Sequence, residues 1–140
     1  MNRNMMRDSF RLLQKSGHKL TEPRRRIIET LYSQQRAFTA LELYQQVADR
    51  GVSLASVYRT LELLVALGLA ETATRTGDEQ HYVACSPEHH HHVICTGCGR
   101  VADVTECLLE SFETFVGEQT GFTIESHMVE FRGICTACKR

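Results

Sequence analysis

The sequence predicts an α+β protein of two small domains, an N-terminal helical unit closed by a β-hairpin and a C-terminal α/β unit. Three observations support this prediction. Four segments with helical spacing of apolar residues come first, and two short strand patterns follow them. A stretch rich in cysteine and histidine then precedes a strand, helix and strand pattern. With 140 residues shared between two units, each core would be thin and would gain stability from a metal ion or a second subunit.

Charge is distributed unevenly along the chain. Residues 1–84 carry 12 Lys and Arg against 9 Asp and Glu, whereas residues 85–140 carry 4 against 8. This asymmetry predicts a nucleic-acid face on the first half only. The sequence has no apolar run long enough to span a membrane and no secretory signal, so we expect a cytoplasmic protein without membrane contact. In that reducing compartment the six cysteines are expected to bind metal rather than form disulfides.

The first two helices carry clear end signals. An amphipathic pattern over residues 7–16 predicts the first helix, which Gly17 would end. Thr21 is expected to cap the second helix, with Pro23 in its first turn, where a missing N–H does no harm. The arginine run that starts at Arg24 could be a solvated helix face or could contact phosphate, and the pattern leaves both open.

A helix-turn-helix pattern follows. Thr39 and Glu42 form a capping box at the start of the third helix, Gly51 would end it, and Ser53 would cap the fourth. The inward apolar positions of the fourth helix are expected to be Leu54, Val57, Leu61, Leu64 and Val65. The polar residues expected to face outward are Ser56, Arg59 and Thr60, with Tyr58 at the margin. Side chains of these types bind phosphates and base edges.

Two strand patterns complete the first domain. Residues 69–73 and 80–83 predict a pair of short strands, joined by a turn at residues 76–79. A helix-turn-helix followed by a hairpin is a winged helix, so we expect residues 1–84 to form a winged-helix DNA-binding domain. A small helical domain without a ligand is the alternative that the pattern alone leaves open.

The C-terminal pattern predicts a β-α-β unit. A strand is expected around Val101, then a helix capped by Thr105 and ending before Gly121, and a longer strand over residues 122–133. The helix would bury an apolar stripe of Leu108, Leu109, Phe112, Phe115 and Val116. Exposed strand edges make this unit a suitable dimerisation platform. The expected division is therefore a dimerisation domain at residues 93–140 and a metal-binding hinge at residues 85–92.

Two C-x-x-C pairs bracket the C-terminal domain. Each pair can supply two corners of a tetrahedron, and four sulfurs favour zinc over hard cations and leave no open position for a substrate. We therefore expect a structural zinc site, whose ligands are Cys95, Cys98, Cys135 and Cys138. Two independent redox dithiols are the alternative, but the strand-to-helix context of such motifs is missing here.

Four consecutive histidines precede the first cysteine pair. Side chains alternate in an extended segment, so His89 and His91 would point one way and His90 and His92 the other. One run of histidines can therefore serve two metal sites.

Several motifs resemble those of the ferric uptake regulator family of bacterial metal-sensing repressors. They are KLTEPR at residues 19–24, SLASVYRTL at residues 53–61, the histidine and cysteine run at residues 89–98 and the cysteine pair at residues 135–138. The resemblance extends over essentially the full chain. It implies a homodimer with N-terminal winged helices and a C-terminal dimerisation domain, which represses metal-uptake operons when metal is bound.

Departures from the family pattern favour zinc as the regulatory metal. Iron and peroxide sensors of the family usually have a histidine near the position of Ala37, and they tend to have a carboxylate at the position of Cys85. Cys and His suit Zn²⁺, so the chain is most similar to the zinc uptake regulator branch. That branch implies a regulatory hinge site of Glu71, Cys85, His90 and His92. It also implies a second exchangeable site of His89, His91, Glu110 and His127.

Two residues near these sites are left open. Asp103 is a carboxylate alternative, because peroxide sensors of the family use one there. Cys107 lies three residues before Glu110 and is interpreted as a free thiol.

The expected function is repression of zinc-uptake genes by a zinc-loaded dimer bound to palindromic double-stranded operator DNA. The predicted DNA contacts are Lys19, Arg24, Ser56, Tyr58 and Arg59. We expect neither enzymatic activity nor a small-molecule substrate. An iron- or peroxide-responsive regulator is the alternative within the family. A small zinc-dependent hydrolase or deaminase is the alternative from another class, although the chain lacks the paired motifs of a deaminase.

Overall fold

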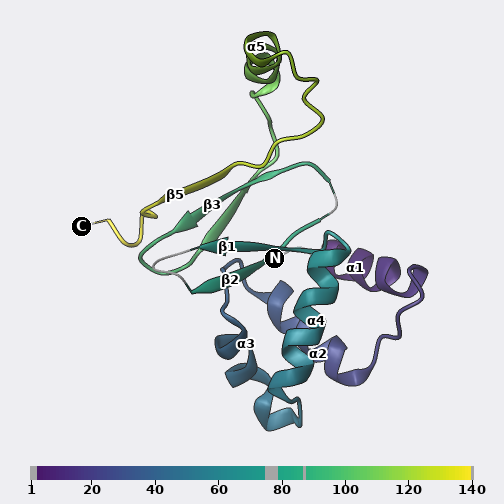
Figure 1. Cartoon of the computed structure of the whole chain (residues 1–140). Helices are drawn as coiled ribbons and strands as arrows, with labels where there is room; N and C mark the ends of the chain where they lie inside the picture. The colour runs from purple at the N-terminus through teal and green to yellow at the C-terminus, as the bar shows by residue number, and fades with distance from the viewer. Residues whose placement is uncertain (1–2, 75–78, 87, 140) are drawn as a thin grey trace.

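The N-terminal half is a helical domain closed by a two-stranded hairpin (Figure 1). This computed structural model describes residues 3–74, 79–86 and 88–139. The elements are α1 (Arg3–Lys15), α2 (Glu22–Ser33), α3 (Ala40–Val47), the 3-10 helix η1 (Ala48–Arg50), α4 (Leu54–Ala66), β1 (Ala70–Thr74) and β2 (Gln80–Ala84). The predicted helix-turn-helix corresponds to α3 and α4, and the hairpin is the wing. Within the described ranges, no helix is long and apolar enough to cross a membrane.

The predicted helix-end signals are confirmed. The side chain of Thr21 caps α2, that of Ser53 caps α4, and Thr39 and Glu42 form a reciprocal capping box at the start of α3. Gly51 ends η1 with a φ of 76°, a left-handed conformation that glycine adopts without strain. These local signals therefore fix where the helix-turn-helix begins and turns.

The core of this domain lies where α2, α3 and α4 meet. Its fully buried side chains include Leu13, Ile27, Ile28, Leu31, Phe38, Leu43, Val57, Leu61 and Leu64. The inward face of α4 differs from the prediction at two positions, because Thr60 is 1% exposed and Val65 is 37% exposed. Thr60 occupies the i+3 position of the stripe that starts at Val57, whereas Val65 lies beyond the edge of that stripe.

The wing is attached to the loop before α3. Strands β1 and β2 pair antiparallel, and Phe38 exchanges backbone hydrogen bonds of 2.9 and 2.7 Å with Tyr82. The predicted pair of strands is therefore confirmed. Of the predicted turn at residues 76–79, residues 76–78 lie outside the described residues, as does residue 87 of the predicted hinge.

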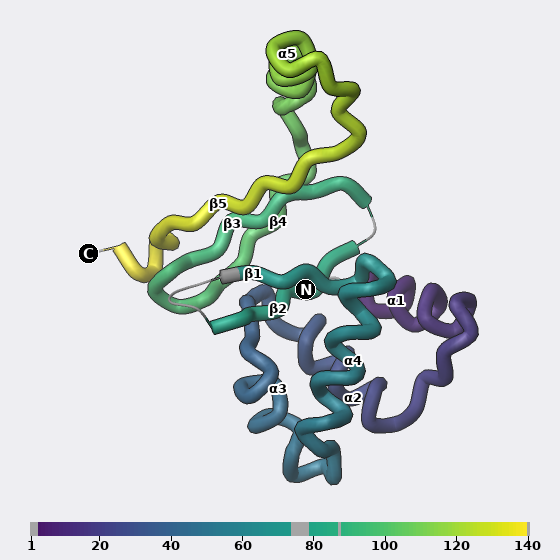
Figure 2. Tube along the Cα trace, in the orientation of Figure 1, coloured from purple at the N-terminus to yellow at the C-terminus, as the bar shows by residue number. Residues whose placement is uncertain are grey.

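The C-terminal half is a three-stranded sheet with one helix standing away from it (Figure 1). Its elements are β3 (His91–Cys95), β4 (Val101–Val104), α5 (Glu110–Thr120) and β5 (Glu130–Gly133). The strand order is β4-β3-β5, with β3 antiparallel to β4 and parallel to β5. Figure 2 shows β5 running beside β3 although a long stretch of chain separates them. The predicted α+β fold class is confirmed.

The segments around α5 differ from the prediction. The helix begins at Glu110 without a side-chain cap, so the predicted cap at Thr105 is wrong. Only residues 130–133 of the strand predicted over residues 122–133 pair as a strand. The sequence pattern predicted a longer helix and a longer strand than the structure has. A strand requires a hydrogen-bonded partner, and β3 pairs only with the end of the segment at residues 122–133.

The predicted burial of the α5 stripe is also wrong for the single chain. Leu108, Phe112 and Phe115 are 87%, 58% and 53% exposed. Extended segments carry α5 away from the sheet, so the sheet does not cover this apolar face in the part of the chain that the structure describes (Figure 1). The helical spacing of the stripe thus indicates a face suited to a second molecule.

Backbone hydrogen bonds dock the two halves beside the first C-x-x-C pair. The N–H of Ala37 donates to the carbonyl of Gly99, and the N–H of Val101 donates to the carbonyl of Gln35, both at 2.8 Å. Ala37 is fully buried in a small apolar cluster with Ala73, Val83, Ile94 and Val101. The position near which iron sensors are expected to have a histidine therefore serves here to join the domains.

Tyr32 ties α2 to both ends of the hairpin. Its hydroxyl lies 2.7 Å from the carbonyl oxygen of Leu69 and 2.9 Å from that of Cys85. Burial raises the pKa of Tyr32, so the hydroxyl remains a donor. This contact holds the entrance of β1 and the exit of β2 in register with the helices.

Replacing Tyr32 by Phe should lower the free energy of unfolding by about 1–3 kcal/mol, because the single hydroxyl proton that the carbonyls of Leu69 and Cys85 share is lost. Urea unfolding at a fixed free zinc concentration measures this difference. Tyr58→Phe is the control, since Tyr58 is 46% exposed and its change should cost less than about 0.5 kcal/mol. Equal stability of Tyr32→Phe and the unmodified protein would contradict the assigned role.

Candidate metal centres

Four thiols converge at the end of the C-terminal sheet. Cys95 ends β3, Cys98 follows in the next turn, and the second cysteine pair follows β5. Because β3 and β5 are parallel neighbours, with Cys95 opposite Gly133, the two pairs meet at one edge. The sulfurs of Cys98 and Cys135 are 3.7 Å apart. A tetrahedron with Zn–S bonds of about 2.3 Å has edges of roughly 3.8 Å, so this spacing fits zinc.

Electrostatics within this group also suit a cation. Backbone N–H groups, above all that of Cys135, lower the pKa of Cys95 to about 6. Hydrogen bonds with the neighbouring thiols raise the pKa of Cys138 to about 12. Four sulfurs this close cannot all become thiolates without a positive charge between them. Gly97 packs so closely here that a Cβ would lie 3.1 Å from the sulfur of Cys138.

A second group joins the wing to the C-terminal sheet. Nε2 of His92 lies 3.1 Å from Nε2 of His90 and 3.2 Å from a carboxylate oxygen of Glu71 in β1. These distances are close to the edges of roughly 3.3 Å in a tetrahedral site with bonds of about 2.0–2.1 Å. The three residues line a pocket of about 390 Å³. This hinge group, Glu71, His90 and His92, therefore spans both halves of the chain.

Hydrogen bonds orient both histidines of the hinge group. Nδ1 of His92 contacts a carboxylate oxygen of Asp103 at 2.9 Å, and Nδ1 of His90 contacts the carbonyl of Glu88 at 2.5 Å. The bond with His92 lowers the pKa of Asp103, which therefore stays ionised. Both Nε2 atoms are left facing the pocket, as metal-binding imidazoles require. The sequence left open whether Asp103 is a metal ligand. In the structure its carboxylate holds the ring of His92 in place.

The structure does not bring Cys85 into the hinge group. Its thiol donates to the carbonyl of Gly68 at 3.3 Å, and the residue is 2% exposed. Burial raises the pKa of Cys85 to about 12, so the sulfur is protonated. The structure thus assembles three of the four predicted hinge ligands, and the assignment of Cys85 stays a prediction.

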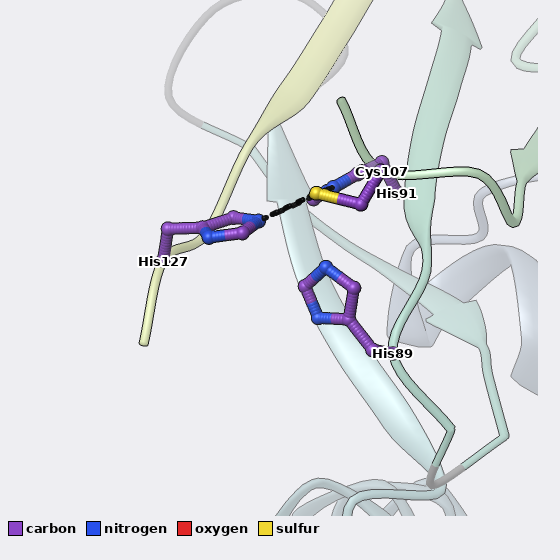
Figure 3. Close-up of side chains that lie close together, drawn as sticks. All are labelled: His89, His91, Cys107 and His127. Carbon is purple, nitrogen blue, oxygen red and sulfur yellow. Dashed lines mark hydrogen bonds between the residues drawn. The ribbon is translucent and has the colours of Figure 1, made fainter. Parts of the chain in front are cut away.

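The third group gathers three imidazoles and a thiol (Figure 3). The sulfur of Cys107 lies 3.3 Å from Nε2 of His91 and 3.3 Å from Nε2 of His127. The rings of His89 and His91 meet edge to face at 4.8 Å between centroids. Burial, and after it the neighbouring histidines, lower the pKa of His91, which keeps that imidazole neutral and able to bind metal. We call these residues the His3Cys group.

The His3Cys group differs from the predicted second site at one position. Glu110 is not one of the four clustered residues, but it lines a pocket together with His89, Cys107 and His127. Sequence reasoning missed Cys107 because it placed this residue inside a helix starting at Thr105, whereas the chain is not helical there. It also missed Glu113, whose carboxylate contacts Nδ1 of His127 at 2.5 Å and turns Nε2 toward the group.

The side chains of the four consecutive histidines alternate in direction, as predicted. His89 and His91 belong to the His3Cys group, and His90 and His92 belong to the hinge group. The run therefore supplies both groups from opposite sides of one extended segment, which continues into β3 at His91.

The predicted DNA contacts belong to the loop before α2, to α2 and to α4. Four of them, Lys19, Arg24, Ser56 and Arg59, line one surface pocket of about 400 Å³. The guanidinium of Arg24 donates to the carbonyl of Lys19 at 2.9 Å, which fixes the loop before α2 beside α4. Tyr58 projects from α4 with 46% exposure but does not line that pocket.

Comparisons with known proteins agree with this architecture. The model of the ferric uptake regulator family matches residues 15–132. The ferric uptake regulation protein of Campylobacter jejuni is 27% identical over 132 residues, which cover 91% of this chain and 84% of that protein. The peroxide-responsive repressor PerR of Staphylococcus epidermidis is 29% identical over 136 residues, 96% of this chain and 90% of its own length.

Among solved structures, a zinc uptake regulator complexed with zinc and DNA has the same fold. Its TM-score is 0.73 at 23% identity, and the match covers 96% of this chain and 92% of that chain. Relatives named for iron, peroxide and zinc responses thus all resemble this chain, and similarity alone does not select the metal.

Replacing Asp103 by Ala should weaken zinc binding by about 10–100-fold, because His92 loses the partner that orients its ring. Competition with a chromophoric chelator measures this affinity. Glu130→Ala is the matched control, since Glu130 lines the same pocket and is paired with Arg132 rather than with a histidine. An unchanged affinity in Asp103→Ala would show that His92 is held by other contacts.

Proposed function

Because the chain belongs to the ferric uptake regulator family, we propose that it is a zinc-responsive repressor that binds palindromic operator DNA as a dimer and controls zinc-uptake genes. The hinge group carries this proposal. Glu71 comes from the wing, whereas His90 and His92 come from the C-terminal half, so one ion held by them would set the position of the wing.

Metal control follows from this placement by population shift. The backbone bonds at Ala37 and Val101 form one link between the halves, and the hinge group forms a second at the other end of β3. A second link at a distance from the first, which includes the apolar cluster around Ala37, would restrict the orientation of the winged helix further. The effect is limited by the ratio of zinc affinities for the two arrangements, and a change from 1:99 to 99:1 requires about 10⁴-fold.

The ligand chemistry supports zinc. The His3Cys group holds nitrogen and sulfur donors, which suit Zn²⁺ better than Mn²⁺ or Fe²⁺. Cys85 lies beside the hinge group and is proposed to join it after losing its proton. Zinc binding at this thiol would release a proton, so affinity should fall with decreasing pH.

One observation favours the alternative, an iron- or peroxide-responsive regulator. If Cys85 keeps its bond to Gly68, the donors of the hinge group are the carboxylate of Glu71 and the imidazoles of His90 and His92. Carboxylate and imidazole donors suit harder ions. The choice of metal therefore depends on Cys85.

A second copy of the chain is the proposed partner of the exposed α5 face. Leu108, Phe112, Phe115 and Phe122 are each more than half exposed, and Phe112 and Phe115 stack on one another at 6.1 Å between ring centroids. Pairing two such faces about a twofold axis would bury them and present two α4 helices to successive half-sites.

Operator binding should depend on zinc rather than on iron or manganese. Fluorescence anisotropy of labelled operator DNA, measured in buffers that fix each free metal concentration, provides the test. Cys85→Ser should need much higher free zinc than the unmodified protein. Binding that does not depend on metal would refute zinc control, and binding that responds best to iron would favour the alternative regulator.

Arg59 is proposed to contact a base, and Arg24 a phosphate. Arg59→Ala should lose about 1–3 kcal/mol of discrimination between operator and a site with one changed base pair. Arg24→Ala should weaken binding to all sequences alike and reduce the slope of log affinity against log salt by about 1. Competition assays at several salt concentrations separate the two effects. Unchanged discrimination in Arg59→Ala would remove the base contact from this residue.

A further inference from the structure

We propose that the thiolate of Cys107 is the fourth zinc ligand of the His3Cys group, in place of the carboxylate of Glu110. Zinc held there would fasten the base of α5 to β3. The inference rests on the proposed function in one respect, because it requires that the His3Cys group binds metal. It concerns which atom is the fourth ligand.

The spacing of the four side chains matches a tetrahedral site. Cys107 Sγ is 3.3 Å from Nε2 of both His91 and His127, and those two nitrogens are 3.4 Å apart. Bonds of about 2.0–2.1 Å to nitrogen and about 2.3 Å to sulfur give edges of roughly 3.3–3.6 Å. His89 closes the remaining side, with ring centroids 4.8 Å from His91 and 4.7 Å from His127 (Figure 3).

The nearby carboxylates occupy different positions. Glu110 is an exposed residue in the first turn of α5, and Glu113 contacts the outer nitrogen of His127. The carboxylate of Glu113 therefore orients the ring of His127. Cys107, by contrast, is partly buried and already in contact with two ligand nitrogens.

The chain around Cys107 explains why its thiol can reach the group. Residues 105–109 are not helical, and α5 starts only at Glu110. The segment thus leads from β4 past the histidines before the helix begins. His127 lies in the segment that returns from α5 toward β5. A metal bound to His91, Cys107 and His127 would therefore join both segments that flank α5 to the central strand.

This placement links the site to assembly. The apolar face of α5 is exposed and its position relative to the sheet depends on the two flanking segments. Fixing both segments to β3 would set the direction of that face. A thiolate ligand would also make this site prefer Zn²⁺ and Co²⁺ over Mn²⁺.

Cobalt spectroscopy of the full-length protein tests the assignment, because a thiolate bound to Co²⁺ gives a charge-transfer band in the near ultraviolet and a carboxylate does not. The structural cysteine group is kept filled with zinc, and released zinc is monitored with a chromophoric chelator. Cys85→Ser is the background, since it removes the other predicted thiolate. Added Co²⁺ should then give a band that Cys107→Ser abolishes and Glu110→Gln leaves intact.

His127→Ala should abolish the same band, and circular dichroism checks that each variant is folded. No charge-transfer band in the Cys85→Ser background would overturn the inference. So would a band that disappears in Glu110→Gln but persists in Cys107→Ser. The proposed repressor function is judged separately by zinc-dependent operator binding, which can hold for the unmodified protein whichever residue is the fourth ligand.

Discussion

The parallel pairing of β3 with β5 is the constraint on which the metal chemistry of this chain depends. It places Cys95 beside the cysteine pair that follows β5, and at the other end of the same two strands it brings His127 near His91. No local motif could do this, because the paired segments are separated by β4 and α5. The side-chain alternation of β3 then divides the histidines between two groups. A single strand thus supplies ligands to three clusters.

Local chemistry was sufficient to predict the parts of the fold that short-range hydrogen bonds determine. The caps at Thr21, Thr39 and Ser53 and the left-handed turn at Gly51 need only residues nearby in sequence. The start of α5 was not predictable in this way. The stripe from Leu108 onward has helical spacing, but this spacing describes a face for a partner and says nothing about where the backbone leaves its extended path after β4.

The candidate sites show the same division. Cysteine pairs and alternating histidines could be identified from spacing, because two thiols on one turn or two rings on one side of a strand are fixed by local geometry. The roles of the carboxylates could not. Asp103 and Glu113 contact the Nδ1 atoms of His92 and His127, which face away from the groups. Glu71 instead contacts Nε2 of His92, which faces the hinge group. A carboxylate that binds the metal and one that orients a histidine are the same residue types in the sequence. Only the histidine nitrogen that each carboxylate faces distinguishes the two roles.

The two ends of β3 are suited to different tasks. At its C-terminal end, the cysteine group adjoins the backbone bonds that join Gly99 to Ala37 and Val101 to Gln35, so this end is held to the helix-turn-helix by the same turn that holds the thiols. At its N-terminal end, the hinge group contacts the wing through His92 and Glu71. The first end is a fixed reference because its hydrogen bonds do not require an exchangeable ion. Regulation is therefore expected at the second end, where the contact between His92 of the C-terminal sheet and Glu71 of the wing is one that a metal ion can rearrange.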